Sequence, residues 1–204
     1  MTEPHHLVTH IDQEISARGA ARPPLRVGIM VDSLSLTGWV AKIITDIQKS
    51  SIAQVVLVVR NAAPARPREK SLRKRLKTYW THSLFERYRR WDRKRSRVEP
   101  DAFDLMDMTD ALKDVPVLSV TPLQKGFTDR FPPESISCIR DANLDVLFRF
   151  GFRIIRGEIL SCAKYGIWSF HHGDSREYRG APPGFWEMYE GSAVTGSILQ
   201  VLTE

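Results

Sequence analysis

The stretch that decides the fold is residues 25–59, LRVGIMVDSLSLTGWVAKIITDIQKSSIAQVVLVV. Two short apolar runs rich in β-branched residues, Arg26–Val31 and Val55–Val59, are typical of strands buried in a parallel sheet. Between them, apolar side chains recur every three or four residues, at Trp39, Val40, Ile43, Ile44 and Ile47. That spacing predicts a helix over residues 39–48 with one apolar face. A strand, a helix and a strand within this length predict a right-handed βαβ unit, the start of a doubly wound sheet.

The same alternation of strands and helices returns in the second half of the chain. The predicted elements are, in chain order, a strand at Val115–Val120, a helix over 133–142, a strand at Asp145–Phe150, a loop over 151–155, a helix over 158–164 and a strand at Gly166–Phe170. The predicted fold class is therefore α/β, a Rossmann-like, mostly parallel sheet with helices on both faces. In open α/β sheets, ligands bind at the carboxyl ends of the strands, so the residues that follow these strands are the candidates for function.

Length and composition predict a single globular domain. The chain has 204 residues, of which 42% are hydrophobic and 26% charged, close to the average for domains that bury a core. No apolar run approaches the roughly 20 residues that cross a bilayer, and the N-terminus lacks the pattern of a signal peptide, so we expect a cytoplasmic protein. Residues 1–24 are polar and end in two prolines, and we expect a mobile tail there, before an α/β domain over 25–204.

No metal site is expected. Cys138 and Cys162 lack the spacing of a zinc site and are too few for a disulfide scaffold, so we expect reduced, structural thiols. His5, His6 and His10 have no carboxylate or cysteine cluster beside them in the sequence to complete a metal site. No GxGxxG pattern follows the first strand, which disfavours dinucleotide binding.

The positive charge is concentrated in one segment. Between Arg66 and Arg97 there are 14 lysines and arginines against 3 acidic residues, whereas the whole chain has 30 against 24. Apolar side chains recur every three or four residues, at Leu72, Leu76, Trp80, Leu84, Tyr88 and Trp91. We expect an amphipathic helix inserted into the domain at about 66–97, with a cationic face and an aromatic stripe.

Two interpretations of this helix stay open. In the first, the apolar stripe packs on the domain and the charges only face solvent. In the second, the 71–97 portion contacts an anionic membrane or a lipid-linked or nucleotide-linked substrate. Nucleic acid is disfavoured, because nothing else in the chain resembles a recognition motif.

Candidate catalytic residues lie at the end of the last predicted strand. His171 and His172 occupy the place where an α/β sheet binds its ligands. A histidine can donate a hydrogen bond and exchange a proton near neutral pH. A shift of one residue in strand register would exchange the faces of the two histidines, so the sequence does not decide which one faces the site.

Three motifs within residues 145–202 share their order and spacing with a known family. His171 stands nine residues before Gly180, which lies in Tyr178–Pro183, YRGAPP. Thr195-Gly196 opens the next stretch, and Phe150–Ile155 precedes the histidines. With these residues the segment resembles the N-terminal catalytic domain of the folate-dependent formyltransferases. The resemblance is weaker, but consistent in topology, from residue 25 onward, and the basic helix is outside the common pattern.

The resemblance implies transfer of a formyl group from 10-formyltetrahydrofolate to an amino acceptor. It implies catalytic roles for His171, Ser169, His172 and Asp174, folate contacts at Phe150, Gly151, Phe152, Ile154 and Gly173, and substrate contacts at Arg179 and Gly180. The basic helix, together with the lack of a recognisable tRNA-binding domain, favours an acceptor that is an amino sugar on a nucleotide or lipid carrier.

Two departures from the family pattern support an alternative. Ser169 stands where the family has the asparagine of Asn-x-His, which removes an amide donor. The family's Leu-Asp-x-Gly would fall just beyond Glu204, so we expect a domain that is incomplete at its C-terminus. The alternative is a non-formylating or inactive module that binds an anionic glycan precursor or a membrane surface, with the basic helix in peripheral contact with the inner membrane. The acceptor and the oligomeric state are left open.

Overall fold

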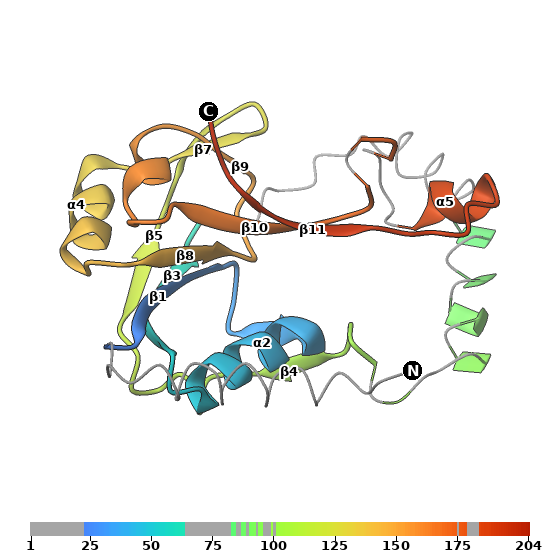
Figure 1. The fold of residues 1–204 in the computed structure, drawn as a ribbon, viewed down its shortest axis with the longest axis horizontal. Coiled ribbons are helices and arrows are strands. Elements are labelled where there is room, and N and C mark those ends of the chain that lie inside the picture. Colours follow the sequence, from blue (N-terminus) through green and yellow to red (C-terminus); the bar gives the residue numbers. More distant parts are fainter. Residues whose placement is uncertain are drawn as a thin grey trace.

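A six-stranded sheet forms the centre of the molecule (Figure 1). The computed structural model describes residues 23–63, 83–84, 87–88, 90–92, 94–95, 99, 101–174, 176–178 and 184–204. The strands follow the order β11-β10-β8-β1-β3-β5. Their bounds are β1 Leu25–Val31, β3 Ala53–Asn61, β5 Val117–Val120, β8 Val146–Arg149, β10 Ile167–His172 and β11 Ser197–Val201. The first five strands in chain order are parallel, and β11 runs antiparallel to β10 at the edge of the sheet.

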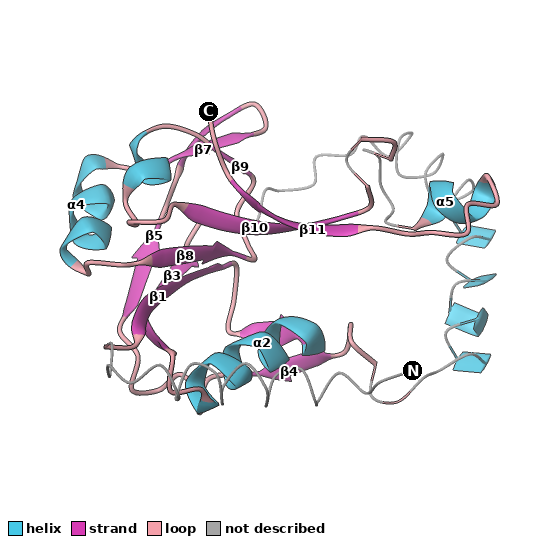
Figure 2. Ribbon diagram, viewed as in Figure 1, coloured by secondary structure: helices cyan, strands magenta, loops and turns pink. Residues whose placement is uncertain are grey.

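Helices lie on both faces of the sheet (Figure 2). On one face, α2 (Gly38–Lys49) buries Val40, Ala41 and Ile44 against β1 and β3. On the other face lie α4 (Pro133–Asp141) and the short 3-10 helix η1 (Glu158–Ser161). Proline occupies the first turn of α4, where its missing N–H costs nothing, which fixes the start of that helix.

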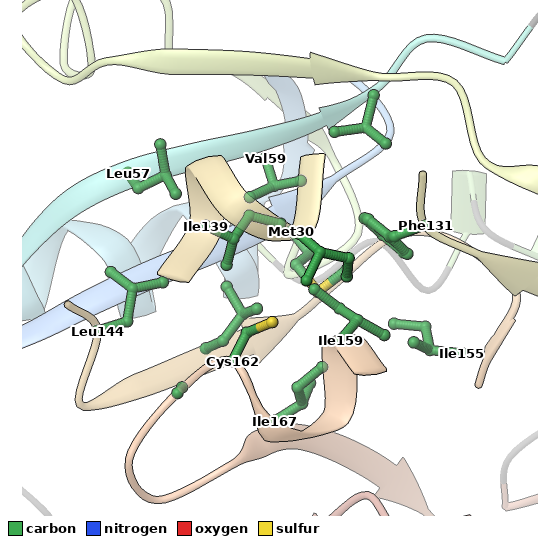
Figure 3. Close-up of a cluster of buried hydrophobic side chains, with 14 of the residues drawn as sticks. Met30, Leu57, Val59, Phe131, Ile139, Leu144, Ile155, Ile159, Cys162 and Ile167 are labelled. Carbon is green, nitrogen blue, oxygen red and sulfur yellow. The ribbon is translucent and has the colours of Figure 1, made fainter. Parts of the chain in front are cut away.

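Each face of the sheet has its own hydrophobic core. Met30 of β1 and Val59 of β3 meet Ile139 of α4 and Ile159 of η1 on one side (Figure 3). Ile29 and other side chains of β1 pack against α2 on the opposite side. Because alternate residues of a strand point to opposite faces, a strand that is covered on both sides must be apolar throughout, which explains the continuous apolar runs in the sequence.

Two small sheets flank the central one. β2 (Ser35–Thr37) pairs antiparallel with β4 (Leu105–Asp107), and the three strands β6 (Leu123–Lys125), β7 (Thr128–Arg130) and β9 (Ile154–Ile155) pair in that order. The last helix is α5 (Phe185–Tyr189).

The fold class predicted from the sequence is confirmed, and three local predictions are wrong. The helix expected over 158–164 is a four-residue 3-10 turn. The loop expected over 151–155 contains β9, and the strand expected to end at Phe170 continues through both histidines, because β11 pairs with it as far as His172.

Two other predictions fall largely on residues outside those described. The tail over 1–24 is described only at its last two residues. In the basic segment, Leu84, Tyr88, Trp91 and the other residues described between 83 and 95 are helical.

Candidate active site

The carboxyl ends of three neighbouring strands bring the candidate residues together. β8 lies between β1 and β10, and all three run parallel. The loop after β1 therefore begins beside the loop after β8 and near the end of β10. Asp32, the segment 150–153 and the segment 171–174 share this edge of the sheet.

Asp32 ties the loop after β8 to the end of β1. Its Oδ1 atom accepts hydrogen bonds from the Asn61 side-chain amide (2.8 Å) and from the backbone N–H of Phe152 (2.9 Å). A Cβ atom on Gly151 would lie 2.6 Å from the backbone nitrogen of Asp32, so the two backbone segments meet at a distance that only glycine permits. The position of the loop backbone is therefore fixed by β1.

Phe152 and Asp129 hold the same loop from the other side. Phe152 adopts a left-handed backbone conformation, with φ of 65°, and its ring is buried 5.1 Å from that of Phe131. Asp129 is fully buried and accepts hydrogen bonds from the backbone N–H, Nε and Nη2 of Arg153. Such a charge is stable in the interior only because it is paired and fully hydrogen-bonded.

Ser169 and His171 lie on one face of β10, two residues apart. Ser169 is buried, and its Oγ accepts a hydrogen bond from Arg149 Nη1 at 3.1 Å. The Nε2 atom of His171 is buried and has no hydrogen-bond partner among the described residues. A buried polar atom without a partner is costly in an ordinary core and is a common mark of a ligand site.

His172 points to the opposite face of the sheet. Its ring lies 5.6 Å from that of Trp39 in α2, which also contacts the rings of Phe150 and Phe170 edge-on. The strand register, His171 opposite Ile198 and His172 opposite Ser197, thus separates the two histidines. Ser169 shares its face with His171.

Gly173 and Asp174 form a tight turn after β10. Gly173 has φ of 100°, donates its N–H to the Gly196 carbonyl at 2.7 Å, and would place a Cβ atom 3.1 Å from the Tyr178 carbonyl oxygen. The Asp174 carboxylate accepts the backbone N–H of Arg176, and its carbonyl accepts that of Tyr178. These bonds occupy Asp174 within the turn itself.

The remaining predicted site residues are dispersed. Phe150 is half-buried in the aromatic cluster around Trp39, and Ile154 is exposed in β9. Arg179 and Gly180 lie outside the described residues.

The sequence analysis missed Arg149, which contacts Ser169 directly. Its guanidinium also donates to the carbonyl oxygens of Phe152 and Arg153, at 2.8 to 3.1 Å. Burial lowers the pKa of Arg149, while the negative charges of Asp32 and Asp129 oppose that shift. A charged residue inside an otherwise apolar strand was the signal that could have identified it.

Other features lie away from this edge. A shallow cleft at the amino ends of β8 and β10 is lined by Arg140, Asn143, Asp145, Lys164 and their neighbours. The described part of the chain holds no cluster of metal-binding side chains and no helix long and apolar enough to cross a membrane.

Comparison with known proteins adds a relative. The methionyl-tRNA formyltransferase of Trichodesmium erythraeum (strain IMS101) is 30% identical over 92 residues, which are 45% of this chain and 27% of that protein. The resemblance to the folate-dependent formyltransferases is confirmed. This chain thus matches about a quarter of the length of its formyltransferase relative. No protein-family model matches the chain.

Solved structures similar to the chain include two glycinamide ribonucleotide transformylases. That of Geobacillus kaustophilus has a TM-score of 0.49 and 15% identity, over 89% of this chain and 76% of its own. That of Symbiobacterium toebii has a TM-score of 0.48 and 13% identity, over 88% of this chain and 66% of its own.

Proposed function

We propose that this formyltransferase-like domain transfers a formyl group from 10-formyltetrahydrofolate to an amino acceptor, at the carboxyl edge of β1, β8 and β10. The observation that carries the proposal is the buried Nε2 atom of His171, which has no hydrogen-bond partner among the described residues. It lies on the same strand face as a buried hydroxyl, Ser169, that is hydrogen-bonded to the cation of Arg149. An imidazole and a hydroxyl on β10 beside a guanidinium on β8 suit a reaction in which negative charge develops on oxygen and a proton moves.

The residues present fit the formyl donor. When bound, the folate supplies its formyl group: the acceptor nitrogen forms a bond to the formyl carbon, the bond from that carbon to the folate nitrogen breaks, and the amine proton replaces the formyl group on that nitrogen. The backbone of Phe150, Gly151, Phe152 and Ile154 would border the folate, together with Gly173. Because the Cβ positions of Gly151 and Gly173 lie against the backbone of Asp32 and of Tyr178, these two glycines fix the loops that would border the ligand.

We assign the chemistry to His171 and the charge stabilisation to Ser169. The His171 imidazole would accept the acceptor's proton or donate to the carbonyl oxygen as charge builds on it. Donors fixed around such an oxygen are typically worth about 10² to 10³ in rate each. Asp174 would keep the turn after β10 in shape, and Arg179 and Gly180 would contact the acceptor.

Titration calorimetry with 5-formyltetrahydrofolate, a stable analogue of the donor, tests the proposal on the intact chain. We expect binding by the wild type, at least tenfold weaker binding by His171→Ala, and a smaller change for His172→Ala, since the second histidine lies on the other face. No heat at millimolar ligand would rule out the folate site. A loss confined to His172→Ala would move the site to the opposite face of the sheet.

The acceptor that we propose is an amino sugar on a nucleotide or lipid carrier. Such acceptors carry phosphate, and the basic segment supplies the matching positive charge: Arg87, Arg90, Lys94 and Arg95 are all exposed. Because formyl transfer needs donor and acceptor bound together, UDP-glucosamine, as a representative nucleotide amino sugar, should bind in titration calorimetry at saturating 5-formyltetrahydrofolate. No binding under these conditions would contradict this acceptor.

One observation supports the second candidate, a module that binds an anionic membrane or glycan precursor. Leu84, Tyr88 and Trp91 are exposed by 75%, 60% and 55%, at the spacing of one helical face, and Arg95 lies 5.4 Å from the Trp91 ring. Exposed aromatics beside cations are typical of helices that lie on anionic lipid surfaces. Sedimentation with phosphatidylserine vesicles would separate the candidates, because only the membrane-binding module is expected to bind vesicles, and charge reversal of Arg90 and Lys94 should then abolish that binding.

A further inference from the structure

Arg149 is the last residue of β8 and the neighbour of Ser169 in the strand register. Its Nη1 atom donates to Ser169 Oγ at 3.1 Å, and its Nε and Nη2 atoms donate to the carbonyl oxygens of Phe152 and Arg153. Three of its bonds thus hold the loop after β8, and the fourth reaches the strand that carries His171.

The guanidinium of Arg149 is charged and only partly exposed. Within the described part of the chain it makes no direct ion pair, because Asp129 pairs with Arg153 instead. Burial lowers the pKa of Arg149, although arginine remains protonated at any physiological pH. A partly buried cation without a carboxylate in contact attracts negative charge more strongly than a fully exposed one.

Two hydrogen-bond donors, one on Arg149 and one on Ser169, remain available where β8 meets β10. A guanidinium has five N–H groups, and the four described bonds leave one N–H on Nη1 without a partner among the described residues. Since Ser169 Oγ accepts from Arg149, its own hydrogen is free to donate in another direction. The buried Nε2 atom of His171 lies two residues further along the same strand face.

We propose that Ser169 is the oxyanion donor of the reaction and that Arg149 is the residue that positions it. Arg149 occupies a lone pair of Ser169 Oγ, so the hydroxyl hydrogen is directed away from β8 and made a stronger donor by the adjacent charge. In this way the pair takes the place of the asparagine amide that is absent at position 169. This inference rests on the proposed function, and it adds Arg149 as a residue that acts by positioning Ser169.

Removal of the hydroxyl is the sharpest test, because Ser169→Ala leaves the bonds of Arg149 to the loop in place. With 10-formyltetrahydrofolate and UDP-glucosamine as substrates, we expect kcat to fall by about 10² to 10³ while affinity for 5-formyltetrahydrofolate changes less than about threefold. Arg149→Lys should also lower kcat, and it should add little further loss to Ser169→Ala, because both act through one hydroxyl. Ser169→Asn, which restores an amide, should keep kcat within about tenfold of the wild type.

Formate binding, followed by ¹³C NMR, gives a readout that does not depend on turnover. Formate places a small anionic oxygen in the site, and we expect at least tenfold weaker binding in Ser169→Ala and in Arg149→Lys. Thermal unfolding of each variant separates this effect from loss of structure. If the wild type fails to bind formate, or if both variants bind it equally well, the inference is overturned even where the folate binds. If folate fails to bind but formate binding depends on both residues, the donor pair stands and the proposed function fails.

Discussion

Replacement of Gly151 by alanine tests whether the loop after β8 is fixed by direct contact with β1. A Cβ atom at this position would lie 2.6 Å from the Asp32 nitrogen and 2.7 Å from the Val31 carbonyl carbon. Both are backbone atoms of a strand end, which no rotamer change can move. An ordinary contact needs at least about 3.4 Å, so the loop must retreat by about 0.8 Å.

The expected cost follows from that displacement. Overpacking of a tight contact destabilises proteins by about 1–3 kcal/mol, and each 1 kcal/mol lowers the melting temperature of a chain of this length by about 2–4 °C. The retreat would also weaken the bond from the Phe152 N–H to Asp32. Because binding sites are sensitive to displacements of about 1 Å, we expect affinity for 5-formyltetrahydrofolate to fall at least about tenfold.

Calorimetric unfolding and folate titration measure the two effects separately. Gly191→Ala is the matched control, since Gly191 has φ of 70° but open space around its Cβ position. It should cost about 1 kcal/mol through backbone strain and leave folate affinity unchanged. Equal melting temperatures for Gly151→Ala and the wild type would refute the close approach. A lower melting temperature with full folate affinity would remove the loop from the site.

Two further predictions concern stability and thiol chemistry. Asp129→Asn breaks the buried pair with Arg153 and should reduce the free energy of unfolding, measured in urea, by about 3–5 kcal/mol. Glu158→Gln is the control, because it breaks the exposed pair with Arg140 and should cost less than about 1 kcal/mol. Equal losses for the two variants would contradict the structure. Burial raises the pKa of the Cys162 thiol above its ordinary value, so iodoacetamide should label exposed Cys138 first, and Cys162 should need a higher pH to react, as judged by peptide mass spectrometry. Because the unfolded thiol ionises first, the part of the stability that depends on Cys162 is present below the ordinary thiol pKa and is lost as the pH rises through the raised pKa.

The sequence predicts the central strands well, because their residues are buried on both sides. Runs such as Val55–Val59 are apolar at every position, which is typical of a strand covered on both faces. The helical spacing after Trp39 is equally distinct. Three-residue strands such as β2 and β4 carry too few side chains for a periodic pattern. Their pairing depends on where the longer elements place them, which local sequence does not record.

The site was predicted in part. The sequence located the histidines at a strand end, but their faces depend on the pairing of β10 with β11. The sequence could not assign a role to Arg149, because Ser169 is 20 residues away in the chain and the parallel register of β8 and β10 brings the two together. The anchoring of the loop by Asp32 and Asp129 likewise depends on contacts between distant segments.

The most direct test of the central claim is to map where 5-formyltetrahydrofolate binds by amide chemical-shift changes in ¹⁵N-labelled protein. We expect the largest changes at residues 150–154 and 169–173, the carboxyl edge of β8 and β10. Changes confined to the cleft at the opposite edge, around Asn143 and Lys164, or no changes at saturating ligand, would contradict the account.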